Sequence, residues 1–345
     1  MLKIFEVSKL AIVILNWNGK HYLEIFLNSI IERSSIPGVS IVIADNNSTD
    51  GSKEWLKTTY PKIRVIELNK NYGFTGGYNR ALSEIESKYY LLLNSDVEVT
   101  EGWLEPLIDS MDKMPKAGIC MPKIKSALDK QSFEYAGASG GFIDFLGYPF
   151  CRGRILSNIE VDSAQYNSDR EIFWASGAAF LIRSSLFHEL GGFDSNFFVH
   201  MEEIDLCWRA KLLGWQVWIF PKSQIYHVGG GTLPNNSPNK LFYNYRNNLL
   251  MLYKNLPSSR LWTVLIFRSI MDFISSFLYL LQGKSKFSNS VWRAHKEFWQ
   301  LKSEIKRDKK LTSTNINSIY RGSIVLAFFL SWKRLRFIKI EERIR

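Results

Sequence analysis

One group of acidic residues in this chain has the surroundings that proton transfer needs. Glu202, Glu203 and Asp205 fall within four positions of a stretch that is otherwise apolar and aromatic. Carboxylates this close raise one another's pKa, which suits a general base. The alternative is a solvated helix start, because acidic side chains also favour a helix N-terminus. The apolar neighbours Phe198 and Trp208 argue against full exposure.

Two further carboxylates, Asp45 and Asp96, each follow a short apolar run. Asp45 could accept hydrogen bonds from a ring N–H and a ribose hydroxyl, and Asp96 could hold a divalent cation that bridges two phosphates. Each could equally cap a turn or a helix. His227 precedes three glycines and is a candidate ligand for a metal or a phosphate, although a lone His is usually structural.

The segment 71–79 is rich in glycine, with Gly73, Gly76 and Gly77. Glycines let a backbone approach a phosphate or a sugar closely, and the helix that follows would offer its N-terminus to an anion. The segment lacks the Gly-Lys-Ser/Thr of a P-loop, and it does not follow the first strand as a dinucleotide fingerprint should. A plain glycine-rich turn is the alternative.

Strands and helices, predicted from apolar runs that alternate with helical patterns, should position these residues. Strands are predicted at 10–15, 39–44, 64–68, 89–93, 171–182 and 217–220, and helices at 22–30, 53–60, 77–86, 203–213 and 242–256. Loops and short strands are expected over 115–172. The alternation predicts an α/β fold with a mostly parallel sheet flanked by helices. Ligands of such sheets bind at the carboxyl ends of the strands, where most of these polar residues fall.

Composition and charge narrow the class of protein. With 345 residues, 46% hydrophobic and 22% charged, the chain is a folded protein and not a disordered or collagen-like one. Its three cysteines show no metal spacing and are predicted to be reduced thiols of a cytoplasmic protein. Residues 282–345 carry 16 Lys and Arg against 5 Asp and Glu, whereas the rest of the chain is balanced, so the net charge of +11 belongs to the tail.

We therefore predict two parts, a neutral domain over 1–257 and a basic amphipathic helical extension over 258–345. Such a tail suits an anionic membrane surface or nucleic acid. Lipid fits better, because no nucleic-acid recognition motif is present and aromatic residues are interleaved with the basic ones. A packed subdomain or a dimer contact is the alternative. Arg268 and Asp272 interrupt the apolar segment 261–281, so we expect no transmembrane span, and no signal peptide is recognisable before residue 15.

Taken in order, the motifs resemble those of the family 2 glycosyltransferases, and within them the bacterial rhamnosyltransferase-like branch. The resemblance runs over 13–256 and rests on Asn-Trp-Asn-Gly at 16–19, Asp-Asn at 45–46, the glycine-rich segment, Asn-Ser-Asp at 94–96, Gly-Phe-Asp at 192–194, Glu-Glu at 202–203, His227 and Tyr-Arg-Asn at 245–247. It implies a GT-A fold and a nucleotide-diphosphate sugar donor.

The resemblance also assigns roles. Glu203 would be the catalytic base, with Glu202 as the second candidate, and Asp96 and His227 would hold Mn²⁺ or Mg²⁺. The donor would contact Asn16, Asn18, Asp45, Asn47, Gly73, Gly76, Gly77, Asn79, Asn94 and Arg246. Two positions depart from the family: Asn94 replaces the first acid of its Asp-x-Asp motif, and Glu203 stands where the family has Asp.

The expected function is that of an inverting glycosyltransferase, peripheral on the inner face of the cytoplasmic membrane. It would move a sugar, with dTDP-rhamnose as one candidate donor, to a hydroxyl of a lipid-linked or growing cell-surface saccharide. One alternative is a sugar transferase that acts on polyprenyl phosphate, which needs little base because its acceptor is already ionised. Another is a sugar-nucleotide-binding protein without catalysis. An oligomer is compatible with each of these three functions.

Overall fold

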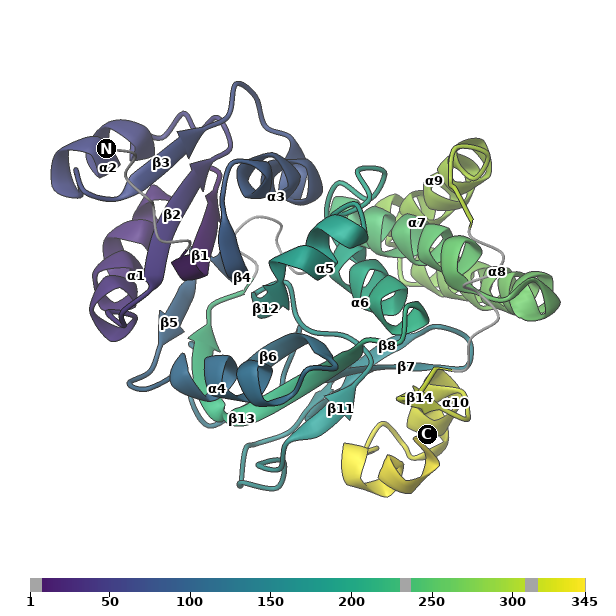
Figure 1. Ribbon diagram of the computed structural model, residues 1–345. Helices are drawn as coiled ribbons and strands as arrows, with labels where there is room; N and C mark the ends of the chain where they lie inside the picture. Colours follow the sequence, from purple (N-terminus) through teal and green to yellow (C-terminus); the bar gives the residue numbers. More distant parts are fainter. Residues whose placement is uncertain (1–7, 230–236, 308–315, 345) are drawn as a thin grey trace.

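The computed structural model describes residues 8–229, 237–307 and 316–344, and Figure 1 shows their path. The segment before residue 8, part of the region searched for a signal peptide, and two of the glycines after His227 lie outside the described residues. The strands are β1 (Ser8–Asn16), β2 (Val39–Asp45), β3 (Arg64–Glu67), β4 (Ser87–Asn94), β5 (Val97–Val99), β6 (Ala117–Ser126), β7 (Gly141–Asp144), β8 (Pro149–Cys151), β9 (Arg154–Ile155), β10 (Asn158–Ile159), β11 (Arg170–Ile172), β12 (Ala179–Arg183), β13 (Gln216–His227) and β14 (Ile319–Tyr320).

The helices alternate with the strands in the first half of the chain and follow them in the second. They are α1 (Lys20–Arg33), α2 (Ser52–Thr59), α3 (Gly73–Ser83), α4 (Glu105–Lys113), α5 (Ser184–Glu189), α6 (Glu202–Leu212), α7 (Pro238–Asn255), α8 (Ser258–Leu281), α9 (Ser285–Leu301) and α10 (Ile324–Leu330), with the short 3₁₀ turns η2 (Phe337–Lys339) and η3 (Glu341–Arg343) near the C-terminus. The predicted α/β fold, flanked by helices and followed by a helical extension, is confirmed.

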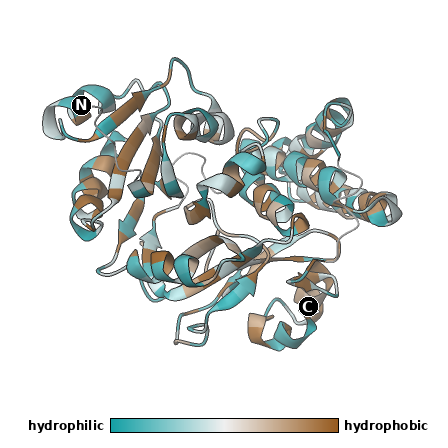
Figure 2. Cartoon of the chain, viewed as in Figure 1, coloured by the Kyte–Doolittle hydropathy of each residue, from teal (hydrophilic) through white to brown (hydrophobic). Residues whose placement is uncertain are grey.

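A nine-stranded sheet carries the strand ends that concern function. Its order is β11-β13-β6-β12-β4-β1-β2-β3, with β5 paired to β13. The strands β3, β2, β1 and β4 are parallel, whereas β12 runs antiparallel between β4 and β6. Leu10 to Ile14 of β1 are all fully buried, as expected for a central parallel strand covered on both faces. Figure 2 shows the apolar residues concentrated in these strands.

Three predicted elements have different bounds in the structure. The predicted strand 171–182 is two strands, β11 and β12, because a turn at Ser176 sends them to different parts of the sheet. The predicted strand 217–220 extends to His227, beyond a register shift around Pro221, which has no N–H to donate. The helix predicted to begin at Gly77 begins at Gly73, so the glycine-rich segment is its first turn and not a preceding loop.

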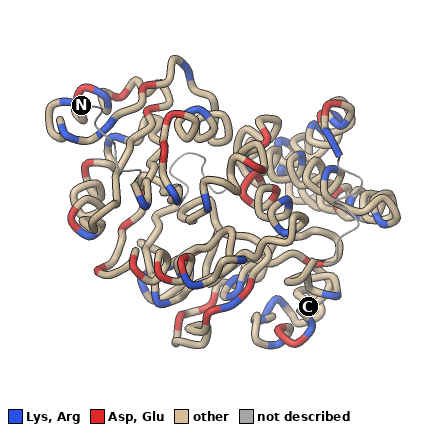
Figure 3. The backbone as a smooth tube through the Cα atoms, viewed as in Figure 1, with Lys and Arg blue, Asp and Glu red and all other residues tan. Residues whose placement is uncertain are grey.

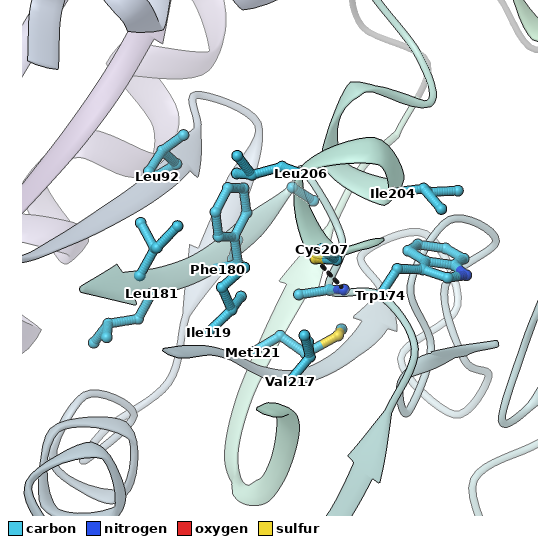
Figure 4. Packing of buried hydrophobic residues seen from close by; sticks show 14 of the residues in the cluster. Leu92, Ile119, Met121, Trp174, Phe180, Leu181, Ile204, Leu206, Cys207 and Val217 are labelled. Carbon is cyan, nitrogen blue, oxygen red and sulfur yellow. Dashed lines mark hydrogen bonds between the residues drawn. The ribbon is translucent and has the colours of Figure 1, made fainter. Parts of the chain in front are cut away.

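The core lies between the large sheet and the helices that cover it. Figure 4 shows how α6 contributes Ile204, Leu206 and Cys207 to the face formed by β4, β6, β12 and β13. Cys207 is buried, and its Sγ accepts a hydrogen bond from the backbone N–H of Ala175 at 3.4 Å. All three cysteines are free and buried, in agreement with the prediction of reduced thiols. Because α6 is anchored in this core, the acidic residues at its start are held firmly.

The C-terminal extension packs back onto the rest of the molecule. A small sheet of order β10-β9-β8-β7-β14 contains a strand from residues 319–320. Helix α9 lies beside α7 and α8 (Figure 1). The predicted domain boundary near Pro257 stays a prediction. The residues after it are in contact with the preceding part of the chain.

Among the described residues, one helix, α8, is long and apolar enough to cross a membrane by length and composition alone. The sequence analysis expected no span there because of Arg268 and Asp272. Both side chains are buried, and Asp272 forms an ion pair with Arg268 at 3.5 Å and lies within hydrogen-bond distance, 3.1 Å, of Nε2 of His295 in α9. The charges therefore lie on the inward face of α8, and they do not interrupt its exposed apolar face.

Candidate active site

The carboxyl ends of β1, β2 and β4 meet at one edge of the large sheet, as the sequence predicts. Asn16 pairs with Asp45 across β1 and β2, and Asn94 lies opposite Leu15 across β4 and β1. Asp96 follows Asn94 by two residues. The candidate residues for a nucleotide and for a metal therefore share this edge.

Asp45 is fully buried, and both of its carboxylate oxygens accept hydrogen bonds from the protein. Oδ2 accepts from Nδ2 of Asn16 at 3.0 Å, and Oδ1 accepts from the backbone N–H of Ser48 at 2.9 Å. The turn-capping role considered from the sequence is therefore present. Contact of Asp45 with a base and a ribose stays a prediction.

Asn18 and Asn47 belong to the loops that follow β1 and β2. Both adopt the left-handed backbone conformation, with φ of 52° and 64°, which Asn tolerates better than most residues. Oδ1 of Asn18 accepts from the backbone N–H of Thr49 at 2.7 Å, so the two loops are tied together. Asn47 is exposed, which leaves its amide accessible to a ligand.

The first backbone N–H groups of α3 are bonded inside the protein. Those of Phe74 and Thr75 donate to the carbonyl of Phe198 at 2.9 and 3.3 Å, and that of Gly73 donates to Oδ1 of Asn71 at 2.8 Å. The prediction that this helix presents its N-terminus to an anion is therefore wrong for this structure. The same N–H groups instead join α3 to the segment that precedes α6.

Close packing accounts for two of the glycines. A Cβ at Gly77 would lie 2.8 Å from the side chain of Leu15, and one at Gly76 would lie 2.9 Å from that of Tyr72. At Gly77 the absence of a side chain lets α3 lie against Leu15 at the end of β1 without displacing it, whereas at Gly76 it leaves room for Tyr72, the residue before the helix. Contact of these glycines with a donor stays a prediction.

Asn79 and Arg246 use their polar groups to hold backbone. Nδ2 and Oδ1 of Asn79 bond to the carbonyl and N–H of Phe193 at 2.8 and 2.9 Å. The buried guanidinium of Arg246 donates through Nη2 to the carbonyls of Asn196 and Phe197 at 2.9 and 3.1 Å. Both residues were predicted to contact the donor, and that contact stays a prediction; in this structure their polar groups hold backbone.

Glu202 and Glu203 lie at the start of α6, and an oxygen of each, Oε2, is buried with no hydrogen-bond partner among the described residues. Burial raises the pKa of Glu203 to about 7. Burial, and then the nearby charge of Glu203, raise the pKa of Glu202 well above its usual range. Only 3% of Glu202 is exposed, whereas Glu203 is half-buried, so Glu203 is the more accessible of the two.

Asp205, the third acid of the group, has the opposite environment. It accepts hydrogen bonds from Nε of Arg209 and Nδ2 of Asn255, both at 2.8 Å, and pairs with Nζ of Lys254 at 3.1 Å. Burial alone would raise the pKa of this carboxyl, but the charges of Lys254 and Arg209 outweigh burial and lower it. Asp205 therefore joins α6 to α7. Glu202 and Glu203 remain the candidates for proton transfer, because each keeps an oxygen without a hydrogen-bond partner among the described residues.

Glu203 borders the strand-end residues through the turn that precedes β12. A Cβ at Gly177 would lie 3.9 Å from the carboxyl carbon of Glu203. The carbonyl of the next residue, Ala178, accepts from the backbone N–H of Asn94 at 2.9 Å. The candidate base and the edge that carries Asp96 therefore belong to one site.

Asp96, His227 and Glu134 form a buried cluster at that edge. Oδ1 of Asp96 lies 3.1 Å from Nε2 of His227, and Oδ2 accepts from the backbone N–H of Gly229 at 3.2 Å. Nδ1 of His227 lies 3.5 Å from Oε1 of Glu134. Burial alone would lower the pKa of His227, but the two carboxylates outweigh it and raise the pKa to about 10. Glu134 was not predicted, because it lies in the irregular region 115–172 without a recognisable motif.

Asp96 and His227 are the residues predicted to hold a divalent cation, and that role stays a prediction. No group of three or more acidic, His or Cys side chains within the described ranges has metal-binding geometry. Asp96 and Nε2 of His227 nevertheless face each other, and Glu134 lies on the Nδ1 side of the ring, the position that an outer partner of a metal-bound His takes. Mg²⁺ and similar ions often take one or two protein ligands and fill the rest of their shell with phosphate oxygens and water.

Comparison with known proteins gives the geometry a context. The model of Glycosyl transferase family 2 matches residues 11–191. An N-acetylglucosaminyl-diphospho-decaprenol L-rhamnosyltransferase of Mycobacterium tuberculosis is 28% identical over 236 residues, which cover 63% of this chain and 75% of that protein. The low-salt glycan biosynthesis hexosyltransferase Agl10 of Haloferax volcanii is 25% identical over 211 residues, covering 59% and 62%.

Two solved structures share the fold. TarS residues 1–349 of S. aureus, in complex with UDP-GlcNAc, superposes with a TM-score of 0.56 and 16% identity, covering 85% of this chain and 81% of that one. GalNAc-T7 with UDP, GalNAc and Mn²⁺ gives 0.54 and 16%, covering 72% and 48%. Both neighbours are GT-A glycosyltransferases. Because the family model spans more than half of the chain, and the GT-A fold and the ordered motifs agree with it, this chain belongs to glycosyl transferase family 2.

Proposed function

We propose that this protein is an inverting glycosyltransferase that uses Glu203 as its base. The observation that carries the proposal is the acidic pair at the start of α6, each with one buried oxygen that has no hydrogen-bond partner among the described residues, near the edge that holds Asp96 and His227. The carboxylate of Glu203 takes the proton of an acceptor hydroxyl. That oxygen bonds to the anomeric carbon from the face opposite the diphosphate, whose bond to the sugar breaks.

The donor and acceptor are proposed from the chain's relatives. We propose dTDP-rhamnose as donor and a lipid-linked saccharide as acceptor, because the mycobacterial relative is named as a rhamnosyltransferase acting on N-acetylglucosaminyl-diphospho-decaprenol. The exposed amide of Asn47, together with Asn18 and Asp45, would contact the nucleoside.

The direct test is an assay of rhamnose transfer from dTDP-rhamnose to synthetic N-acetylglucosaminyl-diphospho-polyprenol, with UDP-GlcNAc as a parallel donor. Product is expected with the lipid-linked saccharide. Product with polyprenyl phosphate alone would favour the alternative transferase. A protein that binds nucleotide sugars, yet neither transfers nor hydrolyses them, would be the non-catalytic alternative.

We propose that Mn²⁺ or Mg²⁺ is held by Asp96 and His227, with the ion replacing the proton that the raised pKa of His227 otherwise keeps on its ring. The ion would neutralise the negative charge of the leaving diphosphate. Glu134 would fix the imidazole ring so that Nε2 faces the ion.

Replacing Asp96 with Asn should weaken donor binding and abolish its dependence on Mn²⁺. Loss of an outer partner of a metal ligand typically costs roughly 10- to 100-fold in metal affinity or activity, and the loss of a ligand should cost at least as much. Calorimetric titration of the donor with Mn²⁺ or EDTA measures the change. Glu98→Gln is the control, because Glu98 lies two residues away and pairs with Lys130 at the surface. If the unaltered protein binds its donor equally well in EDTA and in Mn²⁺, the metal assignment is wrong.

We propose that the exposed face of α8 and α9 docks on the anionic inner face of the cytoplasmic membrane. Apolar side chains project outward from these helices at half exposure or more, including Trp262, Ile266, Phe267, Phe277 and Trp299. Figure 3 shows Lys and Arg in α9 and near the C-terminus, whereas α8 contributes one exposed basic residue, Arg260. Apolar and basic residues on one surface are typical of helices that lie in a membrane interface.

The full-length variant with Ile266→Glu and Phe267→Glu should lose binding to phosphatidylglycerol vesicles. Burying one such side chain is worth about 1.5–3 kcal/mol, so each change should lower the affinity roughly tenfold or more. Cosedimentation measures the bound fraction. Leu128→Glu, at an exposed loop residue away from these helices, is the control. Equal binding of the unaltered protein to neutral and anionic vesicles would contradict the proposal, and a dimer that dissociates in the double variant would assign the face to self-association.

A further inference from the structure

The segment that leads into the acidic pair has an unusual backbone. We call residues 196–201 the base loop. Phe198, His200 and Met201 in this loop all have positive φ, of 61°, 69° and 70°. None of them is glycine, and residues with a Cβ rarely adopt this conformation unless the surrounding structure imposes it. Contacts around the base loop must therefore hold it in place.

Asn247 of α7 supplies three of these contacts. Its side chain is fully buried, and Nδ2 lies within hydrogen-bond distance of the carbonyls of Phe197, Val199 and His200, at 2.9, 2.8 and 2.7 Å. One amide group therefore gathers three carbonyls of the base loop on one side. This arrangement requires the turn that the positive φ values create.

Arg246, the preceding residue, holds the start of the base loop. Nη2 donates to the carbonyls of Asn196 and Phe197, and Nε donates to Oδ1 of Asn247 at 2.9 Å, which fixes the orientation of that amide. Nη1 is bonded to the carboxylate of Glu297 in α9. The guanidinium therefore connects the C-terminal extension to the base loop.

The base loop also contacts the two helices that carry the remaining parts of the site. The carbonyl of Phe198 accepts the N–H groups of Phe74 and Thr75 at the start of α3. The carbonyl of Met201 accepts the N–H of Asp205 at 2.9 Å, in the first turn of α6. The base loop is therefore bonded to α7 on one side and to the starts of α3 and α6 on the other.

We propose that Arg246 and Asn247 are positioning residues that set the base loop, and through it Glu203, against the start of α3. This inference rests on the proposed function, since it assumes that Glu203 is the base. The polar groups of both side chains are engaged by the bonds described above, so we expect neither to contact the substrate. Their loss should therefore leave the binding of the donor intact and lower the rate of transfer.

The test compares Asn247→Ala with Asn248→Ala in the full-length protein, with dTDP-rhamnose and N-acetylglucosaminyl-diphospho-polyprenol as substrates. Asn248 is the adjacent buried Asn of α7, and its Nδ2 donates to the carbonyl of Gly147 at 2.9 Å, away from the base loop. Both variants lose a buried amide. Only Asn247→Ala should lower kcat, by about 10²-fold, with the KM for donor unchanged, because small displacements of a catalytic group have effects of this size.

Two further measurements separate positioning from a loss of stability. In Asn247→Ala, water reaching Glu203 should lower its pKa, so the acid limb of the kcat profile should move to lower pH. Hydrogen exchange at the N–H groups of Phe74 and Thr75 should become faster, because their acceptor moves. Should Asn247→Ala fail to fold, Arg246→Lys keeps the charge opposite Glu297 and loses the bonds to the loop, and it should show the same changes to a smaller degree.

The outcomes distinguish the two proposals. If Glu203→Gln transfers sugar at the normal rate, the proposed function is wrong and the positioning role falls with it. If Glu203→Gln is inactive but Asn247→Ala matches Asn248→Ala in kcat, pH profile and hydrogen exchange, the positioning role alone is wrong.

Discussion

The Glu203→Gln variant should transfer sugar about 10² to 10⁴ times more slowly than the unaltered protein while binding its donor equally well. Gln keeps the shape of the side chain but cannot take a proton, and a positioned general base is worth that range. Donor affinity should not change, because the proposed donor contacts lie at the strand ends and not at this carboxylate. Single-turnover rates combined with donor titration measure the two effects separately.

Glu202→Gln is the matched control, since the two residues point about 100° apart on α6. It should retain most of the activity, because Glu202 is the more deeply buried of the two. Loss of transfer in Glu202→Gln alone would make that residue the base. If neither change matters, an already ionised acceptor such as polyprenyl phosphate becomes the better explanation.

The pH dependence of transfer follows from the same residue. The base must be deprotonated, and burial raises the pKa of Glu203 to about 7. The transfer rate should therefore be low at pH 5, rise through pH 7 and level off above it. A rate that is already constant from pH 5 upward would contradict this assignment.

Replacing Asp205 with Ala should lower the free energy of unfolding by about 3–5 kcal/mol, the usual cost of removing one partner from a buried ion pair. The change leaves Lys254 and Arg209 without their shared acceptor, and Lys254 is then left with Asp194 at 2.7 Å. Urea denaturation at pH 7 measures the loss.

Glu24→Ala provides the comparison, because Glu24 forms an exposed pair with Lys20 at the same i,i+4 spacing as Asp205 and Arg209. Its effect should be at most about 1 kcal/mol. The contribution of Asp205 has a defined pH dependence: since its pKa is lowered from 3.8 in the folded state, the stabilisation is present above pH 3.8 and is lost as the pH falls below it. Equal stability of the two variants would mean that the buried pairs contribute nothing beyond a surface pair.

The sequence predicted the strand ends well because short apolar runs and the polar residues after them are local features. Asn16, Asp45 and Asn94 lie together because parallel strands share a carboxyl edge. The sequence could not show which of Glu202, Glu203 and Asp205 forms ion pairs with basic side chains. That depends on Lys254, some 50 positions away, which reaches Asp205 only once α7 packs on α6.

Other parts of the site were missed for the same reason. The role of Arg246 depends on carbonyl groups about 50 residues earlier in the chain, and every residue has a carbonyl, so no pattern reveals which ones it meets. Glu134 belongs to a region without periodicity. The start of α3 was misplaced because glycines usually indicate a loop, whereas here they permit close packing of a helix on β1.

The strand pairing of β14 with β7 has a consequence for the order in which the molecule matures during synthesis. Ile319 lies opposite Ile143, so 176 further residues must be made after Ile143 before the small sheet can close. Parallel pairings over such separations form slowly, because a long loop must be ordered first. Glu297, which holds Arg246, also emerges late. A chain still on the ribosome can therefore form the strands that carry Asp45 and Asp96 while its base loop is not yet set, so sugar transfer should begin only after translation has passed the C-terminal helices.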